Sequence, residues 1–185
     1  MRLRQLLASD LARQFEIEGK SGLRPNVFRF LGRLLHHRFL PVVVYRTARA
    51  ALLSGIPILP KMLTYLNIVV FGLEVSPRCD IGPGLFFPHT SGTVVGASKM
   101  GRNVTIFQGV TLGAKELDMA FDPSQRPTVG DYVTLGAGCK ILGGIHLGDH
   151  VTVGANSVVL ESVECNTTVV GVPARKTYSQ AAIAR

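Results

Sequence analysis

Five histidines are the side chains of this sequence best suited to exchange a proton near neutral pH, because the unperturbed pKa of histidine is about 6.5. His36 and His37 lie in a basic, apolar stretch, whereas His146 and His150 fall at outward or turn positions of a regular repeat. His89 differs from these four because it lies where that repeat changes phase. We therefore take His89 as the candidate general base.

The elements that position His89 are predicted by a six-residue repeat in residues 74–172. Large apolar residues recur every six positions in three runs, a glycine often follows them, and the fourth position after each is usually small or β-branched. Each unit predicts a short strand and a turn, three units close a triangular coil, and coils stack about 4.8 Å apart. The large positions are Val75, Ile81 and Phe87, then Val94, Met100, Ile106 and Leu112, then Val129, Leu135, Ile141, Leu147, Val153 and Val159.

Two interruptions of the repeat are expected to build the functional face, because insertions in a repeat fold usually do so. Val94 is seven positions after Phe87, so one extra residue is expected to bulge beside His89. Val129 is seventeen positions after Leu112, so residues 115–128 are expected to leave the coil as an extruded loop.

A carboxylate partner for His89 follows from the predicted stacking of coils. Val75 and Val94 are expected to lie on the same side of successive coils, which places Glu74 next to Thr93. Glu74 would then lie about one coil spacing from His89. A carboxylate at that distance orients an imidazole and stabilises its charged form.

The three cysteines are assigned no chemistry. Cys79 and Cys139 occupy small inward positions of the repeat and Cys165 continues the series of large ones, so we expect three buried packing thiols. Their wide separation excludes a disulfide framework or a zinc knuckle and favours a reducing compartment.

The net charge of +8 lies entirely in residues 1–73, which hold 11 Lys and Arg against 3 Asp and Glu, whereas residues 74–185 hold nine of each. With 46% apolar and 17% charged residues the chain is not a disordered polycation. A basic balance alone does not indicate a nucleic-acid partner, and we expect none.

Residues 1–73 are predicted to form amphipathic helices with arginine-rich polar faces, separated by prolines. Val27, Leu31, Leu34 and Leu35 define one apolar face, and Arg46 and Arg49 are placed on the polar face of another helix. The segment either lies on anionic lipid or caps the β-helix and mediates assembly. With neither a signal peptide nor a convincing membrane span, a cytoplasmic protein is expected, with peripheral contact at the inner face of the cytoplasmic membrane as one interpretation.

Four motifs carry a resemblance to a known family: HTSGTVVG at 89–96, QGVTLG at 108–113, GAGCKILG at 136–143 and GVPAR at 171–175. On these motifs, residues 74–176 resemble the left-handed parallel β-helix acyltransferases, and most closely their serine acetyltransferase branch with its relatives that acetylate exopolysaccharides such as colanic acid. The left-handed coil is implied by the resemblance alone, because parallel crossovers are generally right-handed. The fold expected is mainly β, with helices in 1–73, the β-helix in 74–172 and a tail in 173–185.

The resemblance implies an acetyl-CoA-dependent O-acetyltransferase that works as a homotrimer, with its site between neighbouring β-helices and no metal. It assigns His89 as the catalytic base, Glu74 as its supporting carboxylate, and Gln108 to a position directly over His89, where it would form a hydrogen bond to the acceptor or to the histidine. Coenzyme A would lie between neighbouring coils, with Gly113 near the thioester. The remaining candidates for coenzyme A are Ala137, Ala155, Arg175 and Lys176.

Two departures from the serine enzymes bear on the acceptor. Pro88 stands where those enzymes have an aspartate before the catalytic histidine, and Gln125-Arg126 stand where an Arg-His pair helps to hold the amino acid. Without that aspartate the ammonium of serine would lack its natural partner, and an unpaired charge in a closed site is costly. We therefore expect a saccharide acceptor, in exopolysaccharide or capsule biosynthesis, with Arg126 as a substrate-binding candidate.

Three alternatives stay open. The first is a serine O-acetyltransferase of cysteine biosynthesis, and the second is a catalytically silent β-helix scaffold. The third is a hexapeptide carbonic anhydrase, which needs three converging histidines, whereas this β-helix offers His89 with the outward His146 and His150.

Overall fold

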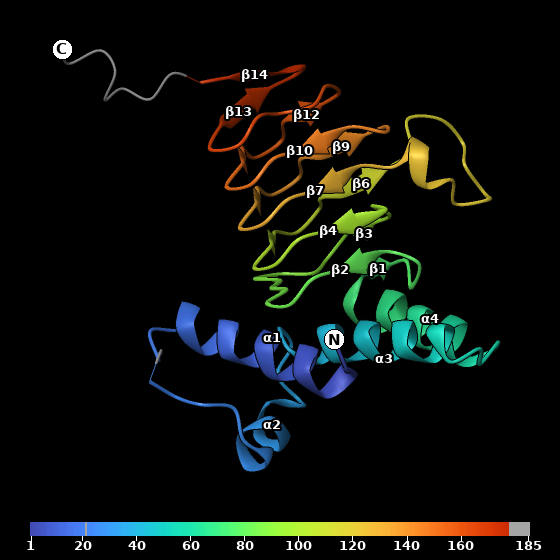
Figure 1. Cartoon of the computed structure of the whole chain (residues 1–185), viewed down its shortest axis with the longest axis vertical. Coiled ribbons are helices and arrows are strands. Elements are labelled where there is room, and N and C mark those ends of the chain that lie inside the picture. The colour runs from blue at the N-terminus through green and yellow to red at the C-terminus, as the bar shows by residue number, and fades with distance from the viewer. Residues whose placement is uncertain (21, 178–185) are drawn as a thin grey trace.

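The computed structural model describes residues 1–20 and 22–177, in which helices form one end of the molecule and a stack of short strands forms the rest (Figure 1). The helices are α1 (Leu3–Ile17), α2 (Val27–Arg33), α3 (Leu40–Leu53) and α4 (Leu59–Phe71). The prediction of a parallel β-helix preceded by helices is confirmed. No helix in the described ranges is both long and apolar enough to cross a membrane.

Local sequence signals explain where these helices begin and end. The Asn26 side chain accepts a hydrogen bond from the Arg29 amide, 2.9 Å away, and caps α2. Pro41 and Pro60 lie in the first turns of α3 and α4, where a missing N–H does no harm. Gly72, with a φ of 61°, ends α4 in the left-handed conformation that glycine adopts without strain.

Three parallel sheets form the sides of the β-helix, and one strand from each sheet makes one coil. The first sheet contains β1 (Leu73–Val75), β3 (Thr93–Val95), β6 (Thr111–Gly113), β9 (Lys140–Leu142) and β12 (Val158–Val159). The second contains β2 (Asp80–Ile81), β4 (Lys99–Met100), β7 (Thr128–Val129) and β10 (His146–Leu147). The third contains β5 (Thr105–Ile106), β8 (Thr134–Leu135), β11 (Thr152–Val153), β13 (Thr168–Gly171) and the antiparallel β14 (Ala174–Lys176).

The core is a stack of buried side chains, one from each strand of each coil. Strands of two to four residues cannot bury enough surface alone, so each coil depends on its neighbours. The inward residues are Val75, Val95, Leu112, Ile141 and Val159 on the first sheet, Ile81, Met100, Val129 and Leu147 on the second, and Phe87, Ile106, Leu135, Val153 and Val169 on the third.

The predicted register at β3 was wrong by one residue. β3 pairs Glu74 with Val94 and Val75 with Val95, and Val95 is the inward residue, 1% exposed, while Val94 is half-buried. Two adjacent valines fit the hydropathy pattern equally well, but a slip of one residue exchanges the two faces of a strand. Phe87 and the next inward residue are thus eight residues apart, two more than the repeat.

The expectation of three buried thiols was wrong for Cys165. Val163 pairs with Leu147 only four residues after the inward Val159, so the last coil is shortened and Cys165 falls in an exposed position. Cys79 and Cys139 are buried as predicted, and burial raises the pKa of each thiol to about 12.

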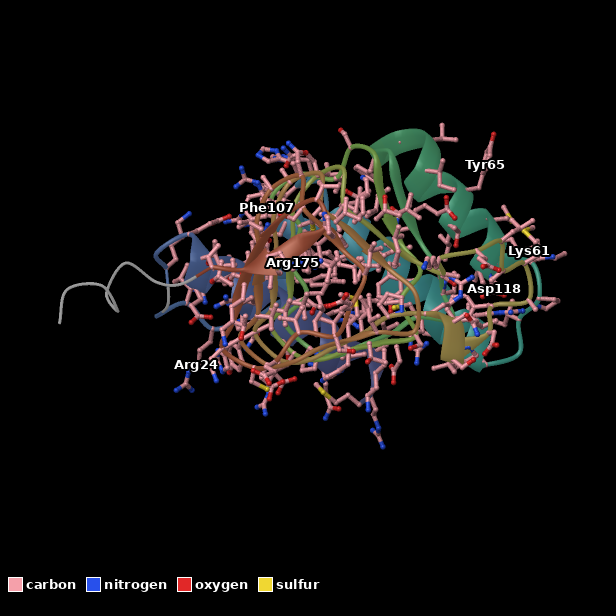
Figure 2. All side chains as sticks on the ribbon, turned by 90° about the horizontal axis from the view of Figure 1, so that it is seen from above. Arg24, Lys61, Tyr65, Phe107, Asp118 and Arg175 are labelled. Atoms are coloured by element: carbon pink, nitrogen blue, oxygen red, sulfur yellow. The ribbon has the colours of Figure 1, made fainter. Side chains whose placement is uncertain are left out.

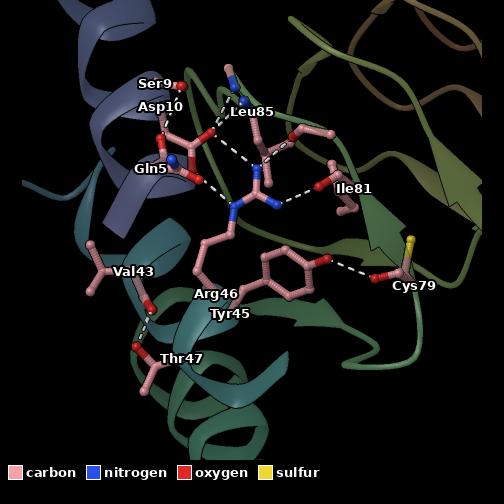
Figure 3. Close-up of polar contacts among 12 residues, drawn as sticks. Gln5, Ser9, Asp10, Val43, Tyr45, Arg46, Thr47, Cys79, Ile81 and Leu85 are labelled. Carbon is pink, nitrogen blue, oxygen red and sulfur yellow. Dashed lines mark hydrogen bonds and ion pairs between the residues drawn. The ribbon is translucent and has the colours of Figure 1, made fainter. Parts of the chain in front are cut away.

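A buried ion pair joins the helices to the first coil (Figure 3). Arg46 of α3 is 1% exposed, which corrects its predicted place on a polar face; it donates to both oxygens of Asp10 and to the carbonyls of Ile81 and Gly82. Asp10 also accepts two backbone N–H bonds from the first coil. Burial raises the pKa of Asp10, while the hydrogen bonds from Arg46 oppose that change.

Candidate active site

His89 lies in a bulge at the corner between the third and first sheets. The chain from Phe87 to Ser91 spans the corner that Ile106 to Gln108 spans in the next coil, and it uses two more residues to do so. The bulge is therefore one residue larger than predicted. It leaves the His89 side chain exposed, so its ring nitrogens can reach a substrate.

Hydrogen bonds from the helical segment hold this bulge in place. Arg38, between α2 and α3, donates from Nε to the Pro88 carbonyl at 3.2 Å. The Thr90 hydroxyl donates to the Phe71 carbonyl at the end of α4, at 2.8 Å. The residues on both sides of His89 are thus held by hydrogen bonds to the helical segment, a role for Arg38 that the sequence pattern did not indicate.

Glu74 lies on the outward face of β1, in the strand next to the one that follows the bulge. Its Cα partner is Val94 rather than the predicted Thr93. Within the described ranges no ion pair or hydrogen bond joins Glu74 to His89. The structure therefore brings the two residues to adjacent strands without direct contact.

Gln108 lies over Ser91 rather than over His89, because the bulge holds two extra residues. The Gly109 amide donates to Ser91 O at 3.0 Å, the Gly138 amide to Gln108 O at 2.8 Å, and the Asn156 amide to Ala137 O at 2.8 Å. These bonds align Ser91, Gln108, Ala137 and Ala155, hereafter the corner column. Three of the predicted site residues thus share one edge of the β-helix, with His89 just before its lower end.

Arg175 and Lys176 lie at the other end of the molecule, in β14. The pairing of Ala174 with Gly171 and of Arg175 with Val170 places β14 at the free end of the third sheet. Both side chains are exposed and line a pocket of about 280 Å³. With strands about 4.8 Å apart, roughly five strand spacings separate β14 from the His89 bulge.

Gly113 lies at the opposite edge of the first sheet from the corner column. It is the last residue of β6, and a Cβ added there would meet nothing within 4 Å, so the surface beside it is open. The chain leaves the coil directly after this edge and returns at β7, whose first residue, Thr128, was assigned to the expected loop. The loop packs on the coil above, since a Cβ on Gly144 would lie 2.0 Å from the Ser124 carbonyl.

The Arg126 side chain joins two parts of the extruded loop to each other and to the coil below. Its Nε and Nη2 donate to the side chain and backbone of Asp118, at 2.8 and 2.9 Å, and its Nη1 donates to Gly96 O at 3.0 Å. The guanidinium also lies 4.0 Å from the centroid of the Phe121 ring. Only 12% of this side chain is exposed, so Arg126 shapes the loop, and direct contact with a substrate stays a prediction.

The corner column and the loop lie on different sides of the β-helix. Seen along its axis, Phe107, the residue before Gln108, and Arg175 lie apart from Asp118 of the loop (Figure 2). The described residues contain no group of three or more His, Cys, Asp and Glu side chains that could hold a metal ion.

Comparison with known proteins identifies the family. The family described as bacterial transferase hexapeptide (six repeats) matches residues 126–161. Soybean serine acetyltransferase, solved as the apoenzyme and with serine, is 33% identical; the match covers 95% of this chain and 69% of that chain, with a TM-score of 0.81 for the apoenzyme. The chain belongs to the serine acetyltransferase family. A serine acetyltransferase complex with CoA is 31% identical over the same shares, with a TM-score of 0.80.

Among curated sequences, the serine acetyltransferase of Synechococcus elongatus is 36% identical over 146 residues, 78% of this chain and 59% of that protein. This chain spans 52% to 59% of the length of the two curated serine acetyltransferases compared. It thus has the fold of the family in a shorter chain.

These relatives overturn the expectation of a saccharide acceptor and of an enzyme of exopolysaccharide or capsule biosynthesis. That prediction was wrong because it relied on Pro88 and Gln125-Arg126, whereas the likeness to serine acetyltransferases extends over 95% of the chain. Arg126 is occupied inside the loop, so the residue at its position is a poor guide to the acceptor. Similarity to exopolysaccharide acetyltransferases is not supported.

Proposed function

We propose that this protein is a serine O-acetyltransferase that uses acetyl-CoA, with His89 as general base. The observation that carries the proposal is the exposed His89 bulge beside the corner column, in a chain whose sequence is 33% identical to that of soybean serine acetyltransferase. Acetyl transfer from a thioester to a hydroxyl needs one base of suitable pKa, and an imidazole supplies it near neutral pH.

In the proposed reaction His89 takes the proton of the serine hydroxyl as the oxygen attacks the thioester carbonyl. The tetrahedral intermediate then collapses, the C–S bond breaks, and the thiolate of CoA takes the proton from the imidazolium. Glu74, in the adjacent strand, stabilises the charged imidazole. Catalytic hydrogen bonds often tighten only when substrate binds, so the absence of direct contact is compatible with this role. Gln108, aligned with Ser91 in the corner column, is the proposed contact to the acceptor.

Acetyl-CoA fits the corner column. Ala137 and Ala155 present small side chains along the edge, so the pantetheine arm can approach backbone groups there. Arg175 and Lys176, exposed at the far end, supply cations for the nucleotide phosphates. Gly113 lies at the opposite edge of the first sheet, so it reaches the same acetyl-CoA only if it comes from a neighbouring subunit.

A homotrimer with its sites between subunits would bring these edges together. Exposed apolar side chains support self-association: Met62, Tyr65, Val69 and Val70 on α4, and Leu117 and Met119 on the loop. Figure 2 places Lys61 and Tyr65 of α4 on the same flank as Asp118 of the loop, and Figure 1 agrees. Exposed apolar patches of this kind mark interaction surfaces.

The test is release of the CoA thiol from acetyl-CoA on addition of L-serine. His89→Ala is expected to lower the turnover number by about 10² to 10⁴-fold, the usual worth of a general base. His150→Ala is the matched control, because that exposed imidazole stacks on Tyr132 with ring centroids 5.0 Å apart, away from the corner column. Serine-dependent release that persists in His89→Ala would remove His89 as the base, and wild-type protein without such release would reject serine as the acceptor.

A further inference from the structure

The end of the molecule formed by α1 and α2 holds an apolar cleft of about 590 Å³. Leu3, Leu7 and Leu11 of α1 line one side, Val27 and Phe30 of α2 line the other, and Arg4 also borders the cleft. α2 lies at the pole of the molecule opposite β13 and β14, away from the corner column (Figure 1).

Apolar side chains of α2 and of the turn after it extend this surface outwards. Phe28 is 82% exposed and Leu35 is 91% exposed, and Val27 and Leu31 are exposed as well. Val27 and Leu31 are four positions apart on α2, the spacing of one helix face, and Leu35 lies in the turn that follows the helix. The predicted apolar face is therefore helical only at Val27 and Leu31, and no residue of α2 is fully buried, although Phe30 packs against Phe39 with ring centroids 5.5 Å apart.

The charge around the cleft is positive because every acid of residues 1–73 is paired with a cation of the same segment. The pairs are Asp10 with Arg46, Glu16 with Arg13, and Glu18 with Arg33. Arg4 and Arg24 are exposed and form no ion pair within the described ranges. Arg24 projects from the outline of the molecule (Figure 2).

From this juxtaposition we infer that the α1–α2 end docks on an anionic phospholipid surface. Phe28, Leu31 and Leu35 enter the boundary between head groups and acyl chains, and Arg4 and Arg24 contact the phosphates. A second copy of the chain is disfavoured because it would bring two cationic surfaces together. A nucleic acid would leave the apolar cleft and Phe28 without a partner.

The test is sedimentation of the full chain with vesicles of phosphatidylcholine alone or of phosphatidylcholine and phosphatidylglycerol at 3:1. Binding is expected to the anionic vesicles only and to weaken as salt rises. The double variant Arg4→Gln and Arg24→Gln should lower the partition coefficient roughly 30-fold, from the usual contribution of two surface cations. The double variant Phe28→Ser and Leu35→Ser should abolish binding.

A matched control removes one cation and one exposed apolar side chain from the β-helix instead, by Arg102→Gln and Leu160→Ser, and should bind vesicles like the wild type. Serine-dependent thiol release without vesicles should not change in the α1–α2 variants, so this inference and the proposed function can fail separately. Wild-type protein that ignores anionic vesicles would overturn the inference. So would self-association, measured by light scattering, that disappears in Phe28→Ser and Leu35→Ser while no vesicles are bound.

Discussion

The β-helix and the helical segment are stabilised in different ways. In the β-helix each coil repeats the inward side chains of the last, and residues 74–185, which include it, carry equal numbers of positive and negative side chains. The helical segment carries the whole charge surplus, leaves many apolar side chains exposed, and joins the first coil through the buried network of Asp10 and Arg46. A repeated core distributes its stability over many similar contacts, whereas the junction concentrates part of its stability in one buried ion pair, beside separate hydrogen bonds such as those of Arg38 and Arg49.

Removing Arg46 should give the largest effect on stability. Arg46→Met leaves the Asp10 carboxylate buried with backbone donors only, and breaking a buried pair in this way costs about 3–5 kcal/mol. Urea unfolding followed by circular dichroism would measure the loss. Adding Asp10→Leu should recover part of it, because two apolar residues can replace a buried pair.

Arg102→Met is the control for Arg46→Met, since Arg102 forms a largely exposed pair with Asp131 at 2.8 Å on the β-helix. It should change the free energy of unfolding far less than Arg46→Met does, because solvent screens an exposed pair. Equal losses in the two variants would mean that the junction is no more dependent on its ion pair than the repeat is.

Removing Arg38 should give a smaller effect, and on activity rather than stability. Arg38→Ala frees the Pro88 carbonyl beside His89, and the loss of one hydrogen bond worth about 1 kcal/mol should lower the turnover number roughly fivefold. Arg38→Lys should restore part of the rate, because an ammonium can also donate to this carbonyl. Thiol-release kinetics with L-serine would measure both.

Arg49→Ala is the matched control for Arg38→Ala. Arg49 also joins a helix to the first coil, through the Pro77 and Arg78 carbonyls and an ion pair with Asp80 at 2.7 Å, but it does not contact the bulge. It should lower the melting temperature at least as much as Arg38→Ala and leave the turnover number unchanged. A matching fall in turnover would show that Arg38 acts through general stability only.

The same contrast explains what the sequence could predict of the fold. The spacing of six predicts the inward side chains of most coils, because burial recurs with the chain. It fails at Val94, where Val95 is equally apolar, and at Cys165, where the last coil is two residues short. It also fails at Arg46, because helical periodicity assigns a face to a residue but cannot reveal a carboxylate 36 positions earlier.

The candidate site follows the same division. The phase break identified His89, and the repeat brought Ala137 and Ala155 to one edge. The predicted position of Gln108 was wrong because the bulge holds two extra residues. Taking Val94 instead of Val95 as the inward residue of β3 made the bulge look one residue long. The contact of Arg38 with Pro88 joins positions 50 apart and leaves no local pattern. The predicted acceptor was wrong because the prediction gave more weight to a few substituted positions than to the similarity of the chain to serine acetyltransferases.

Removing the Glu18 carboxylate should give the smallest effect. Glu18, at the end of α1, pairs with Arg33 and Lys20, and the hydrogen bond from Arg33 holds the pKa of Glu18 below its usual range. Such a carboxylate stabilises the folded state above its ordinary pKa of about 4.5, and that stabilisation is lost as pH falls through the lowered value. Glu18→Gln should therefore cost about 0.5–1 kcal/mol at pH 7.

The difference between Glu18→Gln and the wild type in urea unfolding should shrink as the pH is lowered from 7 towards 3, because both proteins then carry a neutral residue 18. Glu16→Gln is the control, since Glu16 is more exposed and pairs with Arg13 one turn away in the same helix. It should change stability less than Glu18→Gln at every pH. If Glu18→Gln instead lowers the free energy of unfolding as much as Arg46→Met, then ion pairs near the surface stabilise the helical segment as strongly as its buried network does. The proposed difference between the helical segment and the β-helix would then be wrong.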